Sequence, residues 1–296
     1  RIFKIMNFYN IIKTLRPWQW VKNLIVFTVF FGAGSKDVNN LVSLLIVFFG
    51  LSFISSAGYV INDLVDKKID INHPIKKGRP IASGSISQRQ SLFLITTLLI
   101  VSAAIFLQVN FIVTVLGFTY VLLSAAYTYY LKFTKYFDSI SISIMFLLRA
   151  YVGSRAVDIE ISIYLFLFIL TSSFMLGICK KVSILSNLAI MNSYKEYLKN
   201  NYSKSSLITT YKVCLWCSIF IYEGWLTSKI ELYTPFIYLI LFISAISLYY
   251  IFQYILKNSL NGKMEDISYD LFKSFPVLLN IVIIIYISYY TIYINN

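Results

Sequence analysis

The sequence predicts an all-α polytopic membrane protein with nine transmembrane helices. Of its 296 residues, 58% are hydrophobic and only 13% are charged, and the mean hydropathy is +0.72. Soluble domains are about 25% charged, so this composition excludes an ordinary soluble enzyme. Residues 41–51, 91–107 and 281–294 carry no charge. None of these stretches shows the alternating polarity of a membrane β-strand.

Nine apolar stretches are long enough to cross a bilayer, which takes roughly 20 residues. They lie near residues 17–35, 39–61, 90–108, 111–131, 138–156, 161–180, 206–227, 232–256 and 274–294. The first 15 residues are basic and polar, so we expect no signal peptide there. The longest polar connections are residues 62–89 and 180–205, which predicts one integral-membrane domain over residues 1–296.

The placement of the charges predicts the orientation. The chain has 26 Lys and Arg against 13 Asp and Glu, a net charge of +13. Of the basic residues, 22 fall on one side of the predicted spans; Lys36, Arg155 and Lys229 fall on the other, and Arg149 lies within a span. Basic loops face the cytoplasm. We therefore expect a cytoplasmic N-terminus, an external C-terminus and no nucleic-acid partner.

An acidic motif follows the second span, with Asn62, Asp63, Asp66 and Asp70. Spacings of three and four place these side chains on one helix face at the cytoplasmic end. Clustered carboxylates repel one another unless a cation is present, and carboxylate and amide oxygens suit Mg²⁺. We predict that the four residues bind Mg²⁺. The alternative is a solvated helix end whose acids pair with neighbouring lysines.

A basic loop with two prolines and two glycines follows the acids, over residues 72–84. Proline and glycine favour a fixed turn there. Lys76, Lys77 and Arg79 lie within it. Carboxylates beside three cations suit a Mg²⁺–diphosphate, with the metal on one side and the cations on the other. We predict Arg79 and the three aspartates as catalytic residues, and Lys76 and Lys77 as substrate-binding residues.

Other polar residues are weaker candidates for binding substrate: Lys22, Asn62, His73, Lys132, Asp138, Arg149 and Lys180. His73 acts either as a general base or in shaping the loop and hydrogen-bonding the substrate. Arg149 lies inside a span, where a charge is costly and usually functional. About 16 Å of helix separates it from Asp138, so we expect no direct contact. Arg149 then contacts a substrate phosphate or forms a salt bridge with another helix.

Two further groups leave alternatives open. Lys180 and Lys181 either hold a substrate phosphate or act as topology anchors. Glu265, Asp266 and Asp270 precede the last span. We expect them in a solvated loop, the alternative being a segment that closes over the substrate.

The motifs resemble the UbiA superfamily of intramembrane prenyltransferases, through N-D-x-x-D-x-x-x-D over residues 62–70. The resemblance implies a nine-helix bundle around a central cavity, with a Mg²⁺–diphosphate site at its cytoplasmic mouth. Three segments are similar to the branch that makes polyprenyl-phosphate phosphoribose, the decaprenyl-phosphate phosphoribosyltransferase type. They are H-P-x-K-x-x-R-P-I-A-S-G over residues 73–84, R-P-x-Q-W-x-K-N over residues 16–23, and residues 130–153.

The chain departs from the superfamily pattern at two positions. Ile142 stands four residues after Asp138, so only half of a second acidic motif is present. Ile184 stands where the phosphoribosyl branch has a Glu after its two basic residues. The first departure favours one acidic motif, and the second puts the recognition of ribose in doubt.

The resemblance implies an enzyme of cell-wall biosynthesis in the bacterial inner membrane. Its donor would be phosphoribosyl pyrophosphate, its acceptor a polyprenyl phosphate and its cofactor Mg²⁺. The main alternative is a prenyltransferase that moves a prenyl chain from prenyl diphosphate to an aromatic or lipid acceptor. A transporter is less favoured, because its ion site usually lies near the membrane midplane. The oligomeric state stays open, a homo-oligomer included. We expect Asp63→Asn or Asp66→Asn to abolish transfer with little loss of stability.

Overall fold

The computed structural model describes residues 7–73, 76–187, 193–230, 235–264, 270–271 and 273–293. All regular elements within these ranges are helical. Eight helices are long and apolar enough to cross a membrane: α3 (Val38–Val65), α5 (Gln88–Leu107), α6 (Phe111–Tyr129), α7 (Phe137–Val157), α8 (Ile163–Ser186), α10 (Lys204–Thr227), α11 (Pro235–Leu260) and α13 (Phe275–Tyr293). Each overlaps one of the predicted spans from the second to the ninth.

Polar side chains in the connections fix where the helices begin. Asp37, Asn110 and Ser162 accept first-turn backbone N–H groups of α3, α6 and α8. Ser87 and Gln90 bond reciprocally at the start of α5. These side chains satisfy donors that have no partner inside the helix. The short polar turns therefore set the ends of the long apolar helices.

The first predicted span, residues 17–35, is not one long helix. It folds as η1 (Pro17–Phe27), a 3-10 segment, and α2 (Thr28–Gly32), after the short helix α1 (Phe8–Leu15). The η1 backbone presses against α7, since a Cβ on Gly153 would lie 2.4 Å from the Val26 carbonyl oxygen. Asn23 of η1 donates to Ser52 of α3. These contacts hold η1 in the narrower, more extended 3-10 form, and the described chain has eight long helices where nine were predicted.

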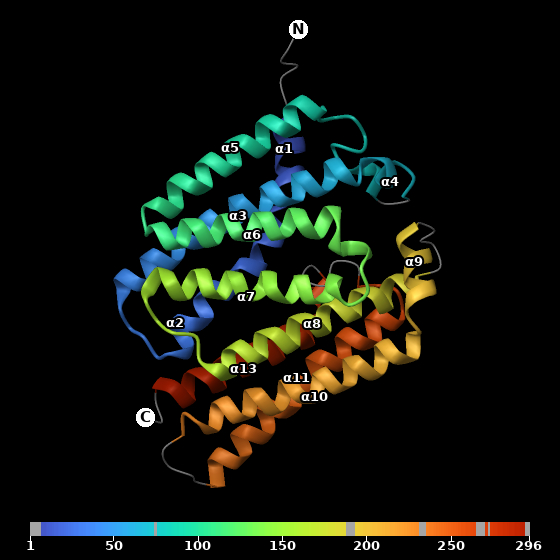
Figure 1. Cartoon of the computed structure of the whole chain (residues 1–296). Helices are drawn as coiled ribbons and strands as arrows, with labels where there is room; N and C mark the ends of the chain where they lie inside the picture. Colours follow the sequence, from blue (N-terminus) through green and yellow to red (C-terminus); the bar gives the residue numbers. More distant parts are fainter. Residues whose placement is uncertain are drawn as a thin grey trace.

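The helices lie side by side in two halves (Figure 1). In the N-terminal half, η1, α5, α6 and α7 contact α3. The buried Phe106 ring fills a slot there, and a Cβ on Gly50 or Gly117 would lie 2.4 Å from it. In the C-terminal half, α8, α10, α11 and α13 share a core that includes Met175 and Tyr211. Contacts between α7 and α8 join the halves.

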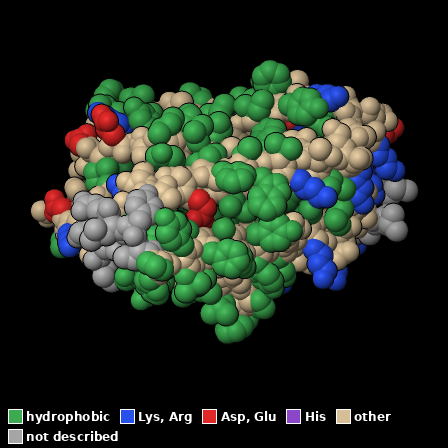
Figure 2. Space-filling model, turned by 90° about the horizontal axis from the view of Figure 1, so that it is seen from below, with side chains coloured by type: hydrophobic (Ala, Val, Ile, Leu, Met, Phe, Trp, Pro, Cys, Tyr) green, Lys and Arg blue, Asp and Glu red, His purple; other side chains and the backbone are tan. Residues whose placement is uncertain are grey.

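The two ends of the bundle differ. The short helices α4 (Lys67–Ile71) and α9 (Ser193–Asn201) lie at one end, and α2 and the C-terminal end of α13 lie at the other (Figure 1). Figure 2 shows Lys and Arg side chains gathered at the α4 and α9 end, with apolar side chains over the middle. Phe220 and Phe275 are 70% and 75% exposed. Apolar exposure of this extent is what a bilayer covers.

Candidate active site

The acidic motif lies where α3 joins α4. Asn62 and Asp63 occupy the last turn of α3, Asp66 caps that helix and Asp70 follows on α4. Asp63 and Asp70 are each 2% exposed. The Asn62 amide donates to Asp66 Oδ2 at 3.2 Å. Helical spacing thus brings Asn62 to Asp66, whereas Asp63 and Asp70 are linked through a residue outside these helices, Arg79.

Arg79 joins Asp63 to Asp70. Its Nη1 donates to Asp63 Oδ1 at 2.9 Å and to Asp70 Oδ2 at 2.6 Å. Burial raises the pKa of Asp70, and the Arg79 guanidinium limits that rise. The predicted basic loop therefore reaches the predicted acidic motif through this arginine.

Local hydrogen bonds shape the basic loop. The Lys76 backbone N–H donates to His73 Nδ1 at 3.3 Å, and His73 is buried. The short 3-10 turn η2 (Lys76–Gly78) is tied to α1, because Lys13 Nζ donates to the Gly78 carbonyl at 2.9 Å. Lys76 is half-buried and Lys77 is exposed. These contacts support the loop-shaping interpretation of His73.

Two further cations reach the acids from outside the loop. Lys132, on η3 (Leu131–Phe133), donates to Asp66 Oδ2 at 2.7 Å, and it is one of the predicted residues. Arg16 Nη2 donates to both oxygens of Asp63, at 2.6 and 2.8 Å. Arg16 is absent from the predicted site. The one sequence feature that could have pointed to Arg16 is its place as the first residue of the R-P-x-Q-W-x-K-N motif.

Arg16, Arg79 and Lys132 therefore donate hydrogen bonds to the three carboxylates, and Lys76 adds positive charge near Asp70. Among the described residues, no three His, Cys, Asp or Glu side chains form a group ready to hold a metal ion. The donor atoms themselves fit Mg²⁺, because they are carboxylate and amide oxygens and Mg²⁺ takes only one or two protein carboxylates. Asp63 and Asp66 can supply that number once their cations give way.

A second buried ion pair connects α7, α8 and α9. Lys181 Nζ donates to Asp138 Oδ1 at 2.6 Å and to the Tyr202 hydroxyl at 3.1 Å. Both charged side chains are 2% exposed. The Tyr194 hydroxyl donates to Asp138 Oδ2 at 3.4 Å; burial and the nearby Asp138 raise the pKa of Tyr194, so it remains a donor. Asp138 is enclosed by these partners, whereas Lys180 lies on the exposed side of α8.

Arg149 is buried in the N-terminal half of the bundle. Its Nε donates to Asn23 Oδ1 at 2.9 Å and its Nη2 to the Tyr120 hydroxyl at 2.6 Å. The guanidinium carbon lies 4.6 Å from the Tyr120 ring centroid and 4.9 Å from that of Phe146. It makes no contact with Asp138, as predicted, and the parts of the chain described here give it no ion pair with an acid. Asn23 is a second residue absent from the prediction.

Lys22, Glu265, Asp266 and Asp270 complete the set of predicted residues. Lys22 Nζ donates to Gln19 Oε1 at 3.0 Å, within η1. Asp270 is half-buried. Glu265 and Asp266 lie outside the described residues.

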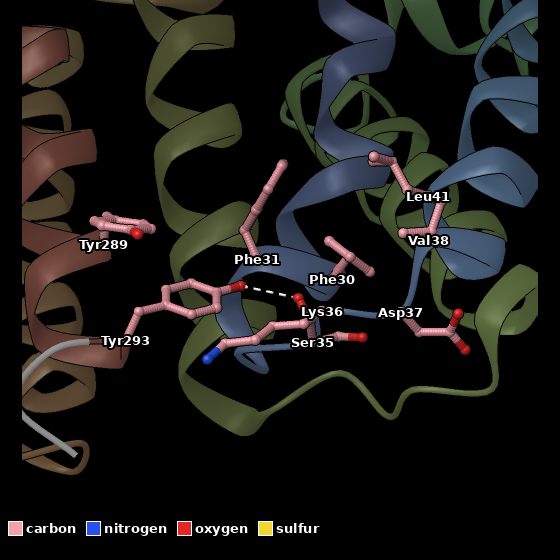
Figure 3. Close-up of a pocket in the computed structure, with 9 residues that line it drawn as sticks. All are labelled: Phe30, Phe31, Ser35, Lys36, Asp37, Val38, Leu41, Tyr289 and Tyr293. Atoms are coloured by element: carbon pink, nitrogen blue, oxygen red, sulfur yellow. Dashed lines mark hydrogen bonds between the residues drawn. The ribbon is translucent and has the colours of Figure 1, made fainter.

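A pocket of about 350 Å³ lies at the opposite end of α3 from the acids. Figure 3 shows its aromatic lining and the hydrogen bond from the Tyr293 hydroxyl to the Ser35 carbonyl, 3.0 Å long. Lys36 and Val38 also line it. The helix rise from Val38 to Asp63 is about 38 Å. This pocket is therefore not part of the acidic site.

Comparison with known proteins identifies the family of the chain. A family model described as the UbiA prenyltransferase family matches residues 23–292. The decaprenyl-phosphate phosphoribosyltransferase of Corynebacterium glutamicum is 33% identical over 159 residues, which are 52% of this chain and 48% of that protein. The 4-hydroxybenzoate octaprenyltransferase of Blochmanniella pennsylvanica is 31% identical over 149 residues, 49% and 51% of the two chains. These matches span about half the length of each curated relative.

The fold has a solved counterpart. The structure of a UbiA homologue from Archaeoglobus fulgidus bound to GPP and Mg²⁺ matches with a TM-score of 0.62 and 14% identity, over 95% of this chain and 98% of that one. At this identity the likeness shows the fold alone. Because the family model spans most of the sequence, the chain belongs to the UbiA prenyltransferase family.

Proposed function

We propose that the chain transfers 5-phosphoribose from phosphoribosyl pyrophosphate to a polyprenyl phosphate and releases diphosphate. One contact carries this proposal: Arg79, from the segment similar to the phosphoribosyl branch, touches Asp63 and Asp70 of the diphosphate motif. The name of the relative from Corynebacterium glutamicum supports the same choice of substrates.

The acids and the basic loop divide the work in this proposal. Asp63 and Asp66, with Asn62 and Asp70 alongside, hold Mg²⁺. Bound there, Mg²⁺ supplies positive charge against the leaving diphosphate. Lys76, Lys77 and Arg79 bind diphosphate oxygens and stabilise the charge that develops as the bond to ribose breaks.

The proposed reaction needs no proton transfer. An oxygen of the polyprenyl phosphate bonds to C1 of the ribose while the C1–O bond to diphosphate breaks, and the diphosphate leaves with the electron pair. The acceptor phosphate is already anionic at neutral pH. A general base is therefore unnecessary, which fits a His73 whose Nδ1 already accepts a backbone N–H within the loop. Catalysis then consists of positioning and electrostatic stabilisation.

The other binding candidates take places around this centre. Lys132 and Lys180 lie at the same end as the acids and are candidates for the substrate phosphates. Arg149 lies deeper, since its partner Asn23 also contacts Ser55, about 12 Å of helix rise from Asp63. We assign Arg149 and Lys22 to the acceptor phosphate. Asp138 holds Lys181 and α9 beside the site.

The proposed topology keeps nine crossings. A 3-10 helix rises about 2.0 Å per residue and an α-helix about 1.5 Å, so Pro17–Gly32 reaches about 30 Å, the thickness of the hydrocarbon core. The segment can therefore cross with fewer residues than a long helix. The charge distribution supports an active-site end that faces the cytoplasm, and the membrane that we propose is a bacterial inner membrane.

A label-transfer assay tests the proposed function. Purified protein in detergent is given Mg²⁺, polyprenyl phosphate and phosphoribosyl pyrophosphate labelled in the ribose, and label is measured in the lipid extract. We expect transfer that is lost with EDTA and restored by Mg²⁺. A parallel reaction with prenyl diphosphate and 4-hydroxybenzoate tests the prenyltransferase alternative. Product in that reaction, with no label in lipid from the first, would reverse the assignment.

A further inference from the structure

Arg16 has a backbone conformation that its residue type rarely adopts. Its φ of 53° and ψ of 60° lie in the left-handed region, and Pro17 follows it. The Arg16 N–H closes α1 by donating to the Ile12 carbonyl at 3.1 Å. A side chain is unfavourable in this region, and residues held there gather at functional sites. The Arg16 side chain, extending from this backbone conformation, reaches the acidic motif.

The Arg16 guanidinium binds Asp63 of the acidic motif. Its Nη2 lies 2.6 Å from Asp63 Oδ1 and 2.8 Å from Oδ2. Its guanidinium carbon lies 5.5 Å from the ring centroid of Tyr59, one turn earlier on α3. Asp63 Oδ1 also accepts Arg79. Both oxygens of a carboxylate that is 2% exposed are therefore engaged by guanidinium groups.

This arrangement conflicts with a metal ion bound alone. Asp63 can coordinate a divalent cation only through one of these two oxygens, and the cation repels a guanidinium at hydrogen-bond distance. Arg16 must then give up at least one of its bonds. A bare metal ion offers the released guanidinium no new anion. A diphosphate does, because the planar guanidinium fork matches phosphate oxygens.

We propose that Arg16 exchanges partners, from Asp63 in the free protein to the diphosphate group of the bound substrate. This inference rests on the proposed Mg²⁺–diphosphate site, and it adds a diphosphate-binding residue to that site. Arg16 then opposes metal binding when no diphosphate is present and favours diphosphate binding once the metal is in place. Each ligand strengthens the binding of the other by the same factor, so bound metal favours diphosphate and bound diphosphate favours metal.

Arg16→Gln separates the two effects, because it removes the charge and keeps a polar side chain. Mn²⁺ alone is titrated into purified protein in detergent, and binding is read from the loss of the free-ion EPR signal. Labelled inorganic pyrophosphate is then titrated at saturating Mn²⁺. We expect Arg16→Gln to bind Mn²⁺ alone about fivefold more tightly and pyrophosphate about fivefold more weakly, the lower end of usual couplings between sites. Arg16→Lys keeps the charge without the fork and should lie between.

The exchange predicts that Mn²⁺ affinity rises while pyrophosphate affinity falls. A purely structural contribution of Arg16 would instead weaken the binding of both ligands. An unchanged or lower Mn²⁺ affinity in both Arg16 variants, or an unchanged pyrophosphate affinity, overturns the exchange. If Arg16→Gln does not fold, the same two affinity changes measured in Arg16→Lys test the exchange. The matched control is Arg155→Gln, an α7 arginine at the other end of the bundle that lies 3.8 Å from Asp158. It should change neither affinity.

Asp63→Asn tells the two proposals apart. It should lose the tight Mn²⁺ binding, and adding Arg16→Gln to it should then have no further effect. Wild-type Mn²⁺ affinity in Asp63→Asn would remove the metal centre from the acidic motif and overturn the proposed function. If Asp63→Asn loses Mn²⁺ binding as expected and the Arg16 variants bind both ligands like the wild type, only the exchange is refuted.

Discussion

Asp63 has a larger structural part in the site than Asp66. Its carboxylate accepts Arg16 through both oxygens and Arg79 through one, and it is 2% exposed. Removing one partner of a buried ion pair costs about 3–5 kcal/mol, because the other charge is left uncompensated. Asp66 pairs with Lys132 where its side chain is 13% exposed. Asp66 has one cationic partner and is more open to solvent than Asp63, so its loss should cost less, towards the about 1 kcal/mol or less of a fully exposed pair.

Neutralising either acid should therefore have the same effect on activity and different effects on stability. Asp63→Asn and Asp66→Asn should each lower label transfer by about a hundredfold or more. Asp63→Asn should also lower the melting temperature clearly, whereas Asp66→Asn should shift it little. Thermal unfolding in detergent, followed by tryptophan fluorescence, measures this. Asp158→Asn, at an exposed acid, is the control. Equal melting temperatures for Asp63→Asn and wild type would show that the two arginines do not depend on that carboxylate.

Separation along the chain decides which site residues are predictable. Asn62, Asp66 and Asp70 follow from helical spacing alone, and Arg79 follows from a turn nine residues after Asp70. Arg16 contacts Asp63 across 47 residues, and Asn23 contacts Arg149 across 126. No local pattern carries such contacts. The sequence expectation of little stability loss in Asp63→Asn changes for the same reason, since the burial and the arginine partners of Asp63 are tertiary features.

At the scale of elements, hydropathy predicts the long helices and misses the form of the first span. Eight spans are visible because length and absence of charge define a membrane helix. The 3-10 form of η1 depends on what packs against it. Gly153 lets the Val26 backbone approach α7, and Asn23 bonds to Ser52 and Arg149. These packing partners lie outside residues 17–35, so the composition of that segment cannot predict the 3-10 form.

A methyl group at Gly153 should therefore displace η1. The added Cβ would lie 2.4 Å from the Val26 carbonyl oxygen and 2.9 Å from its Cα, both backbone atoms. Overpacking of this kind costs about 1–3 kcal/mol, so Gly153→Ala should lower the melting temperature. Gly32→Ala, on α2 next to η1, is the control, because its Cβ would meet only Trp225, at 3.8 Å. Similar melting temperatures for the two variants would mean that η1 is free to move away from α7.

At the scale of the whole molecule, the uneven distribution of charge links the proposed topology to the proposed function. The acids, the basic loop and η3 lie at the end of the bundle where Lys and Arg gather (Figure 2). Basic loops stay on the cytoplasmic side, where a water-soluble phosphorylated donor would be met. In the orientation that we propose, the same cations orient the chain and surround the site. If the orientation were reversed, the acidic motif would face the wrong compartment for such a donor.

Single cysteines at the two ends test this orientation. The background is Cys214→Ser, Cys217→Ser, which keeps the buried Cys179. Into it we introduce Ser83→Cys, four residues after Arg79, or Ser228→Cys at the end of α10; both serines are exposed. A membrane-impermeant maleimide added to intact cells should label Ser228→Cys, and should label Ser83→Cys only after permeabilisation. The opposite pattern would place the acidic motif outside the cell. Ser83→Cys would then be labelled in intact cells, and a cytoplasmic phosphoribosyl donor could not reach Asp63, whatever the purified protein does in detergent.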